Sequence, residues 1–140
     1  ANEPDIAYAH LFSYFKGEEW RTQKETQRLL DKYFTTKPNG IPGNDDTGTM
    51  SAWAIFNMIG FYPDCPGLPE YTLTTPVFNK VTIRLDPKWY KEKELVIESN
   101  RTQPGTLYIN KVLLNGKKFN QYRITHDELV HSQRILFDLK

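Results

Sequence analysis

The feature that most constrains the fold of this chain is a change in hydrophobic spacing near Pro76. Before this residue apolar side chains recur at helical intervals, and after it they alternate as in strands. Charge changes at the same place. Residues 1–75 carry 6 Lys/Arg against 10 Asp/Glu (net −4), and residues 76–140 carry 12 against 7 (net +5), which together give the +1 of the whole chain. We therefore predict an α+β chain whose organisation changes at this proline.

The acidic half predicts three helices. They cover residues 6–15, Thr22–Phe34 and Thr49–Ile59, the last closed by Gly60. The third helix is apolar on nearly all sides and is therefore expected to be deeply buried. Three helices alone make a thin core, so we expect this half to pack against further helices.

The basic half predicts strands. Alternating segments cover Lys80–Leu85, Glu94–Glu98, Leu107–Leu114 and Arg134–Leu139, and Asn115-Gly116 is a typical two-residue hairpin turn. Their spacing predicts an antiparallel β-sandwich-like segment and does not fit a βαβ fold.

Composition excludes several classes of protein. The length of 140 residues fits about one domain, and a net charge of +1 gives no electrostatic argument for binding nucleic acid or an acidic membrane. The longest apolar stretch, near Ala52–Tyr62, is too short to span a bilayer. The single cysteine, Cys65, excludes an intramolecular disulfide and a zinc site built from several cysteines.

The informative chemistry lies in the segment Pro38–Trp53. A loop stiffened by glycine and proline brings Asn44, Asp45 and Asp46 to the start of the third helix. Backbone N–H groups there favour an ionised carboxylate, which suits a general base or a metal ligand. The alternative is that Asp46 or Thr47 only caps the helix while Asp45 is solvated.

The wider sequence around this loop resembles the glycoside hydrolase family 92 α-mannosidases. The segment Gly43–Pro63, GNDDTGTMSAWAIFNMIGFYP, follows the family pattern G-[ND]-[DE]-D-x-G-x-M-S-A-W and G-F-Y-P. Thr75–Phe78 stands where the family usually has Ser-Pro-x-Phe. Upstream, Asn2–Asp5 resembles the N-E-P segment and Trp20–Gln23 the W-[KR]-T-Q segment.

The resemblance implies an exo-acting, calcium-dependent, inverting α-mannosidase that acts on α-mannosides of N-glycans or mannans outside the cytoplasm, in the periplasm or extracellularly. Such enzymes have a β-sandwich followed by an (α/α)6 barrel. Residues 1–75 would be the last helices of that barrel, and residues 76–140 a β-rich C-terminal segment. The family's general acid is a glutamate upstream of the N-E-P segment, so we expect this chain alone to be inactive.

Roles for individual residues follow from the same resemblance. Asp46 matches the family's general base, and Asp45 occupies the acidic position beside it. Asn44, Glu3 and Trp20 are expected to contact substrate. Asn2 and Glu3 are the expected calcium ligands of this chain.

Two other interpretations stay open. The β-rich half and three tryptophans would also suit a non-catalytic carbohydrate-binding module, and a fragment with a purely structural role is the third possibility. Trp53, on the apolar helix, is interpreted as a core residue. Without neighbouring helices, we expect the faces around Leu11, Phe15 and Tyr33 to drive self-association.

Overall fold

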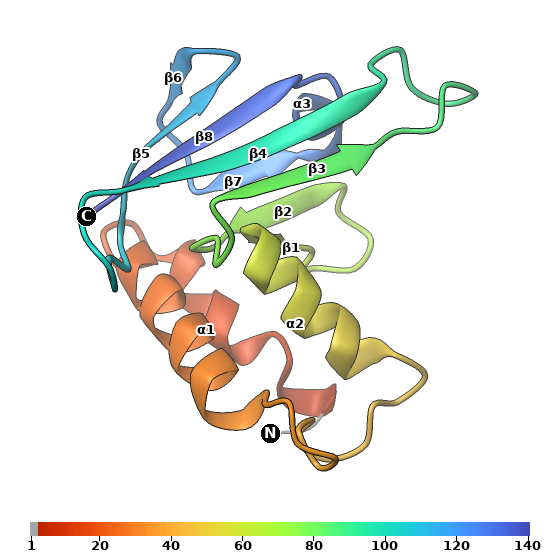
Figure 1. The fold of residues 1–140 in the computed structure, drawn as a ribbon, viewed down its shortest axis with the longest axis vertical. Coiled ribbons are helices and arrows are strands. Elements are labelled where there is room, and N and C mark those ends of the chain that lie inside the picture. The colour runs from red at the N-terminus through yellow and green to blue at the C-terminus, as the bar shows by residue number, and fades with distance from the viewer. Residues whose placement is uncertain (1–2) are drawn as a thin grey trace.

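A computed structural model describes residues 3–140 as a layer of helices beneath two β-sheets (Figure 1). Two 3-10 helices, Glu3–Asp5 and Tyr8–Tyr14, open the described chain. They are followed by α1 (Glu19–Tyr33), α2 (Thr49–Ile59), β1 (Phe61–Tyr62), β2 (Glu70–Leu73), β3 (Lys80–Arg84), β4 (Glu94–Arg101), β5 (Ile109–Leu114), β6 (Lys117–Phe119), β7 (Arg123–Thr125), α3 (His126–Val130) and β8 (Arg134–Leu139). The α+β prediction is confirmed.

The first predicted helix is a 3-10 segment instead of an α-helix. Its buried side chains are confined to Ala9 and His10, which are too few to stabilise an α-helix of several turns. Helix α1 begins three residues earlier than predicted and buries one stripe, formed by Thr22, Gln23, Thr26 and Leu30.

Helix α2 has the predicted bounds. Gly60 ends it in the left-handed region, at φ 117°, and a Cβ there would lie 2.8 Å from the side chain of Pro76. The prediction of deep burial on all sides is wrong at Ile55, which is 56% exposed, whereas Trp53 is 3% exposed as expected of a core residue. One face of α2 therefore lacks a neighbour among residues 3–140.

The larger sheet has five strands in the order β3-β4-β8-β5-β6. All neighbours are antiparallel except β4 and β8, which are parallel. The predicted hairpin is confirmed, with positive φ values at Asn115 (49°) and Gly116 (81°), and β8 has the predicted bounds.

A second, three-stranded antiparallel sheet has the order β1-β2-β7 and was not predicted. Strands β1 and β2 precede Pro76, whereas β7 follows it, so this sheet joins the two parts of the chain. A capping box between Thr125 and Glu128 starts α3 directly after β7. The domain division at residues 75 and 76 stays a prediction.

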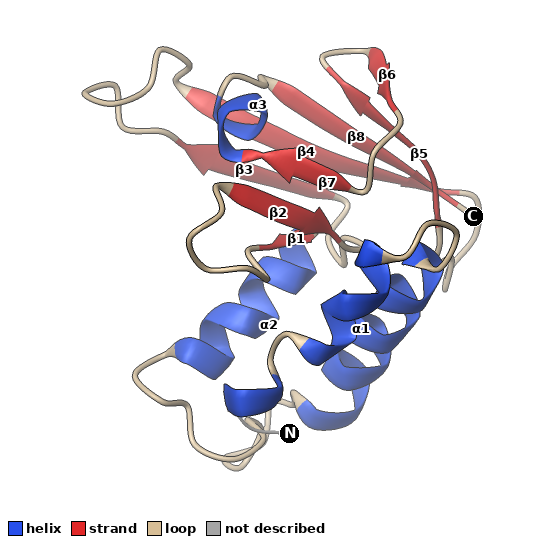
Figure 2. Ribbon diagram, turned by 180° about the vertical axis from the view of Figure 1, so that it is seen from behind, coloured by secondary structure: helices blue, strands red, loops and turns tan. Residues whose placement is uncertain are grey.

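The main core contains apolar residues of both sheets and of α3. Its buried members are Phe61, Leu73, Leu95, Ile97, Ile109, Val112, Ile124, Leu129, Ile135, Phe137 and Leu139. A smaller cluster of Leu30, Trp53, Ala54 and Tyr62 packs α1, α2 and β1 together (Figure 2). None of the helices within residues 3–140 combines the length and apolar character needed to cross a membrane.

Candidate active site

The loop between α1 and α2 lies at the end of the helical layer that is far from the sheets (Figures 1 and 2). Gly40 closes a tight turn in it, because its C=O accepts from Thr35 N at 2.9 Å and its N–H donates to Lys37 O at 2.9 Å. A Cβ at Gly40 would clash with Thr35 O, so only glycine fits this turn. Asp46 (φ 48°) and Thr47 (φ 61°) both adopt the left-handed region, where non-glycine residues are uncommon. Strained backbone of this kind concentrates at functional sites.

The Asp45 side chain caps the first turn of helix α2 from outside the N-cap position, which Gly48 occupies. Its Oδ1 accepts from Ser51 N at 2.8 Å and its Oδ2 from Ser51 Oγ at 2.9 Å. Its main-chain oxygen also accepts from Met50 N at 3.1 Å. The alternative in which Asp46 or Thr47 is the cap and Asp45 is solvated is therefore wrong, because the left-handed turn at residues 46–48 brings the Asp45 carboxylate to the first turn of the helix.

Asp46 contributes only its main chain to the loop. Its C=O accepts from Thr49 N at 3.2 Å and from Thr49 Oγ1 at 2.7 Å. Within residues 3–140 its half-buried carboxylate makes no hydrogen bond or ion pair. Asn44, two residues earlier, is exposed. The two adjacent aspartates thus differ: one is fixed by the helix, and the other is available for a ligand or a water molecule.

The 3-10 helix Glu3–Asp5 lies at the same end of the molecule as this loop (Figures 1 and 2), and Glu3 is its first residue. Glu3 is exposed, and its C=O accepts from Ile6 N at 3.1 Å. The buried Trp53 side chain donates from Nε1 to Ile6 O at 2.9 Å, which fastens this N-terminal segment to α2. Asn2 lies outside the described residues.

Trp20 lies at the opposite end of α1, next to the larger sheet. Its ring meets that of Tyr108 edge to face, with 6.3 Å between the centroids. Since α1 rises about 20 Å along its length, the structure does not bring Trp20 to the aspartate loop within this chain.

The described residues do not form a metal site by themselves. Residues 3–140 contain no group of three or more His, Cys, Asp or Glu side chains that could hold a metal ion. A calcium ion takes six to eight oxygen ligands, and Glu3 supplies a single carboxylate. The donors described here therefore do not fit a complete calcium site.

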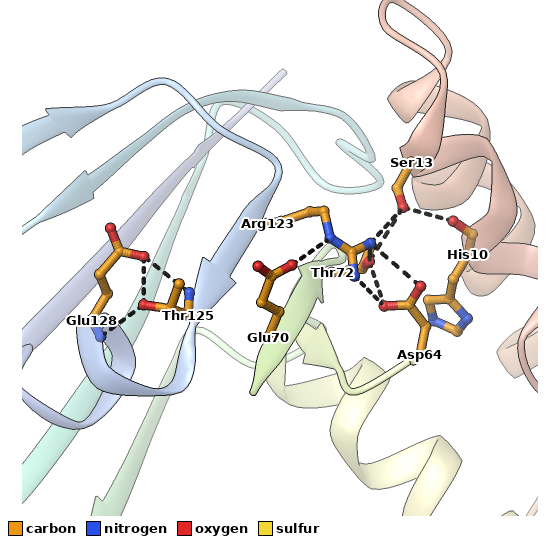
Figure 3. A network of polar contacts seen from close by, with 8 residues as sticks. All are labelled: His10, Ser13, Asp64, Glu70, Thr72, Arg123, Thr125 and Glu128. Atoms are coloured by element: carbon orange, nitrogen blue, oxygen red, sulfur yellow. Dashed lines mark hydrogen bonds and ion pairs between the residues drawn. The ribbon is translucent and has the colours of Figure 1, made fainter. Parts of the chain in front are cut away.

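A second polar cluster, centred on Asp64 and Arg123, was not predicted from the sequence (Figure 3). The Asp64 side chain is 2% exposed; it lies 3.2 Å from Arg123 Nη2 and accepts from Thr72 Oγ1 at 2.8 Å. Arg123 also donates to Glu70 at 3.2 Å and covers the Tyr14 ring at 4.5 Å. Burial alone would raise the pKa of Asp64, but these hydrogen bonds and the Arg123 charge hold it below its ordinary value. The cluster joins the second 3-10 helix, Tyr8–Tyr14, to β2 and β7.

His10 lies beside this cluster and is completely buried. Its Nε2 donates to Asn57 Oδ1 at 2.9 Å, because the Asn57 amide nitrogen already donates to Trp53 O at 2.8 Å. Its ring stacks on Tyr62 at 4.5 Å. Desolvation lowers the pKa of His10, so the folded chain holds it neutral.

Comparison with known proteins identifies the family. The glycosyl hydrolase family 92 catalytic domain matches residues 1–140. The chain belongs to this family.

Two solved family 92 enzymes of Bacteroides thetaiotaomicron share the fold. One, an α-mannosidase solved in complex with mannoimidazole, is 32% identical with a TM-score of 0.89 over 99% of this chain. The other, described as an inverting mannosidase, is 34% identical with a TM-score of 0.85 over the same share. An uncharacterised secreted glycosidase of Arthroderma benhamiae is 29% identical over 90% of this chain.

This family 92 chain spans only a small part of each relative. It covers 18% of each of the two solved enzymes and 16% of the fungal protein. The arrangement around Asp46 thus corresponds to one part of the structure of these larger relatives.

Proposed function

We propose that the natural protein carrying this family 92 chain hydrolyses α-mannosides of glycans such as N-glycans or mannans, removing terminal mannose with inversion of configuration. Two solved relatives at 32% and 34% identity are described as mannosidases, one of them inverting, and this supports the proposal. Inverting hydrolysis needs one carboxylic acid that protonates the leaving oxygen and one carboxylate that activates water on the opposite face of the sugar.

Asp46 is the proposed general base. The observation that carries this assignment is the contrast with Asp45, whose two oxygens are both bound to Ser51, while the Asp46 carboxylate makes no hydrogen bond within residues 3–140. A free carboxylate on a loop fixed by Gly40 and by the cap of α2 can accept a hydrogen bond from water and then take its proton. Asp45 then acts as a positioning residue. Asn44 and Glu3, exposed at the same end, are proposed to contact the sugar.

The general acid is proposed to come from a part of the family protein that is not among these residues. The helices of residues 1–75 are proposed to complete an (α/α)6 barrel, and residues 76–140 to form its β-rich C-terminal segment. Three apolar side chains of this helical layer are exposed, which supports the proposal that further helices cover it: Leu11 (49%), Phe15 (64%) and Ile55 (56%). We therefore propose that the isolated chain turns over no aryl α-mannoside and self-associates, which activity assays and light scattering would test.

Calcium is proposed as the cofactor of the longer natural protein. Glu3 supplies one carboxylate, Asn2 lies outside the described residues, and the remaining oxygen ligands must come from elsewhere. A bound calcium ion would orient sugar hydroxyls. The proposed role of Asp46 as a base does not require contact with the ion. A periplasmic or extracellular location is proposed because the fungal relative is described as secreted.

The stereochemistry of hydrolysis tests this function. The natural-length protein is incubated with an aryl α-mannoside, and the first mannose released is observed by proton NMR before it mutarotates. Inversion predicts that β-mannose forms first. Release of α-mannose first would exclude the inverting mechanism, and absence of hydrolysis with calcium present would exclude the mannosidase assignment.

A further inference from the structure

A cleft at the junction between α1 and the larger sheet is separate from the aspartate loop. Its lining consists of Trp20, Gln23, Tyr108, Ile109, Tyr122 and Lys140. Three of these six residues are aromatic, and Trp20 is 41% exposed. The Trp20 ring is held against Tyr108, and Arg21 Cζ lies 5.3 Å from its centroid. The walls of the cleft are thus aromatic and restrained.

Gln23 supplies a polar group to the cleft. The residue is 2% exposed, and its Oε1 accepts from Ile109 N at 2.9 Å. Because a backbone N–H can only donate, the atom facing Ile109 must be the oxygen, and the position of the amide nitrogen is thereby fixed. Within residues 3–140 this nitrogen makes no hydrogen bond. It is also not one of the fully buried polar atoms that lack a partner. Because Gln23 is part of the lining, this nitrogen is the donor that its side chain has left for an occupant of the cleft.

These features select the chemistry of the occupant. An apolar helix would leave the buried amide donor unpaired, which is unfavourable. Charge favours neither an anion nor a cation in the cleft. Lys140 in the lining is positive, and the negative Glu19 lies close by. Burial raises the pKa of Tyr122, and the charge of Glu19 raises it further. A pyranose ring presents C–H groups to an aromatic face and hydroxyl oxygens to an amide donor, so it satisfies both parts of the cleft.

We propose that this cleft binds one hexopyranose residue of a glycan, in addition to the sugar at Asp46. The choice of mannose as that hexose rests on the proposed function. Since the cleft and the aspartate loop lie at opposite ends of α1, about 20 Å apart, a ligand in the cleft does not contact Asp46. The cleft therefore holds a distant part of a branched or polymeric substrate and affects binding without affecting the chemical step.

Kinetics on two substrates test this site in the natural-length protein. The Trp20→Leu variant should raise KM for an α-mannan about tenfold with kcat unchanged, because one aromatic wall of the cleft is lost. It should leave KM for a small aryl α-mannoside unchanged, since that substrate does not reach the cleft. Trp20→Phe keeps an aromatic ring and should restore most of the mannan affinity. Trp89→Leu is the matched control, because Trp89 is 72% exposed and lies outside the cleft.

A binding measurement separates this proposal from the proposed catalytic function. Calorimetric titration of an α-mannobiose into the Asp46→Asn protein should show two binding sites, one at the aspartate loop and one in the cleft. The added Trp20→Leu change should remove one of them, and Trp89→Leu should keep both. Unchanged binding and unchanged mannan KM in Trp20→Leu would overturn the cleft while leaving the mannosidase intact. If no mannoside is hydrolysed at all, the mannosidase assignment fails, and the titration still decides the cleft.

Discussion

Two aspartates in this chain lie in opposite environments. Asp64 is 2% exposed and is held by Arg123 and Thr72, whereas the half-buried Asp46 has no side-chain partner within residues 3–140. A buried carboxylate with all its partners present stabilises the fold and is not available to a substrate. A carboxylate on a fixed loop without partners contributes little to folding and is available for chemistry. The comparison separates the residues that maintain the structure from those proposed to act on substrate.

The largest effect on stability is expected for Asp64→Ala. Removal of Asp64 leaves the largely buried Arg123 with only the more exposed Glu70 as its ion-pair partner, and breaking a buried pair typically costs about 3–5 kcal/mol of unfolding free energy. Urea denaturation would measure it. Glu70→Ala is the matched control, because Glu70 contacts the same arginine at 3.2 Å but is 38% exposed, and it should cost about 1 kcal/mol or less. Equal losses of unfolding free energy in the two variants would mean that the burial of Asp64 does not make its ion pair with Arg123 more stabilising than that of Glu70.

Acid should weaken the same region in two steps. His10 has a lowered pKa when folded, so stability is lost as pH falls below the ordinary histidine value of about 6.5. Asn57, Asp64, Arg123 and the Tyr62 ring surround it. Asp64 also has a lowered pKa when folded, so its contribution is full above about pH 4 and lost as pH falls further. Urea midpoints across this range should show both steps, and Asp64→Asn should remove only the lower one. A stability that rises as the pH falls would contradict both assignments.

A smaller loss is expected for Asp45→Ala. This variant removes the carboxylate that binds Ser51 N and Ser51 Oγ at the start of α2, which should cost about 1–2 kcal/mol. Asp45→Asn keeps one acceptor oxygen and should cost less. Asn44→Ala, on the exposed neighbour, should leave the unfolding free energy nearly unchanged. If Asp45→Ala were as stable as the parent chain, the hydrogen bonds from Ser51 to the Asp45 carboxylate would not contribute to the stability of the fold.

Local sequence signals predicted the elements that local chemistry determines. Gly60 fixed the end of α2, and Asn115-Gly116 fixed the β5–β6 hairpin. The pairing of β1 and β2 with β7 was missed, because strands of two to four residues carry almost no periodicity and their partners lie far along the chain. The parallel pairing of β4 with β8 was missed for the same reason of distance.

The candidate site was predictable only in part. The motif identified both aspartates, but only the left-handed backbone at Asp46 and Thr47 distinguishes the capping carboxylate from the free one. The Asp64–Arg123 pair joins residues 59 positions apart, and no spacing rule reveals such a contact. Trp20 fits the family pattern, but its position beside Tyr108 follows from the packing of α1 against the sheet.

The most direct test of the contrast between the two aspartates is kcat on an aryl α-mannoside, measured beside the unfolding free energy, in natural-length Asp46→Asn and Asp64→Asn proteins. The amide introduced by Asp46→Asn cannot take a proton from water, so we expect kcat to fall about 10²–10⁴-fold. The unfolding free energy should change by no more than about 1 kcal/mol, since the Asp46 side chain makes no hydrogen bond within residues 3–140. Asp64→Asn should instead lose stability and keep its kcat where it is still folded. A near-normal rate in Asp46→Asn, together with an inactive Asp45→Asn, would contradict the account and place the base at Asp45.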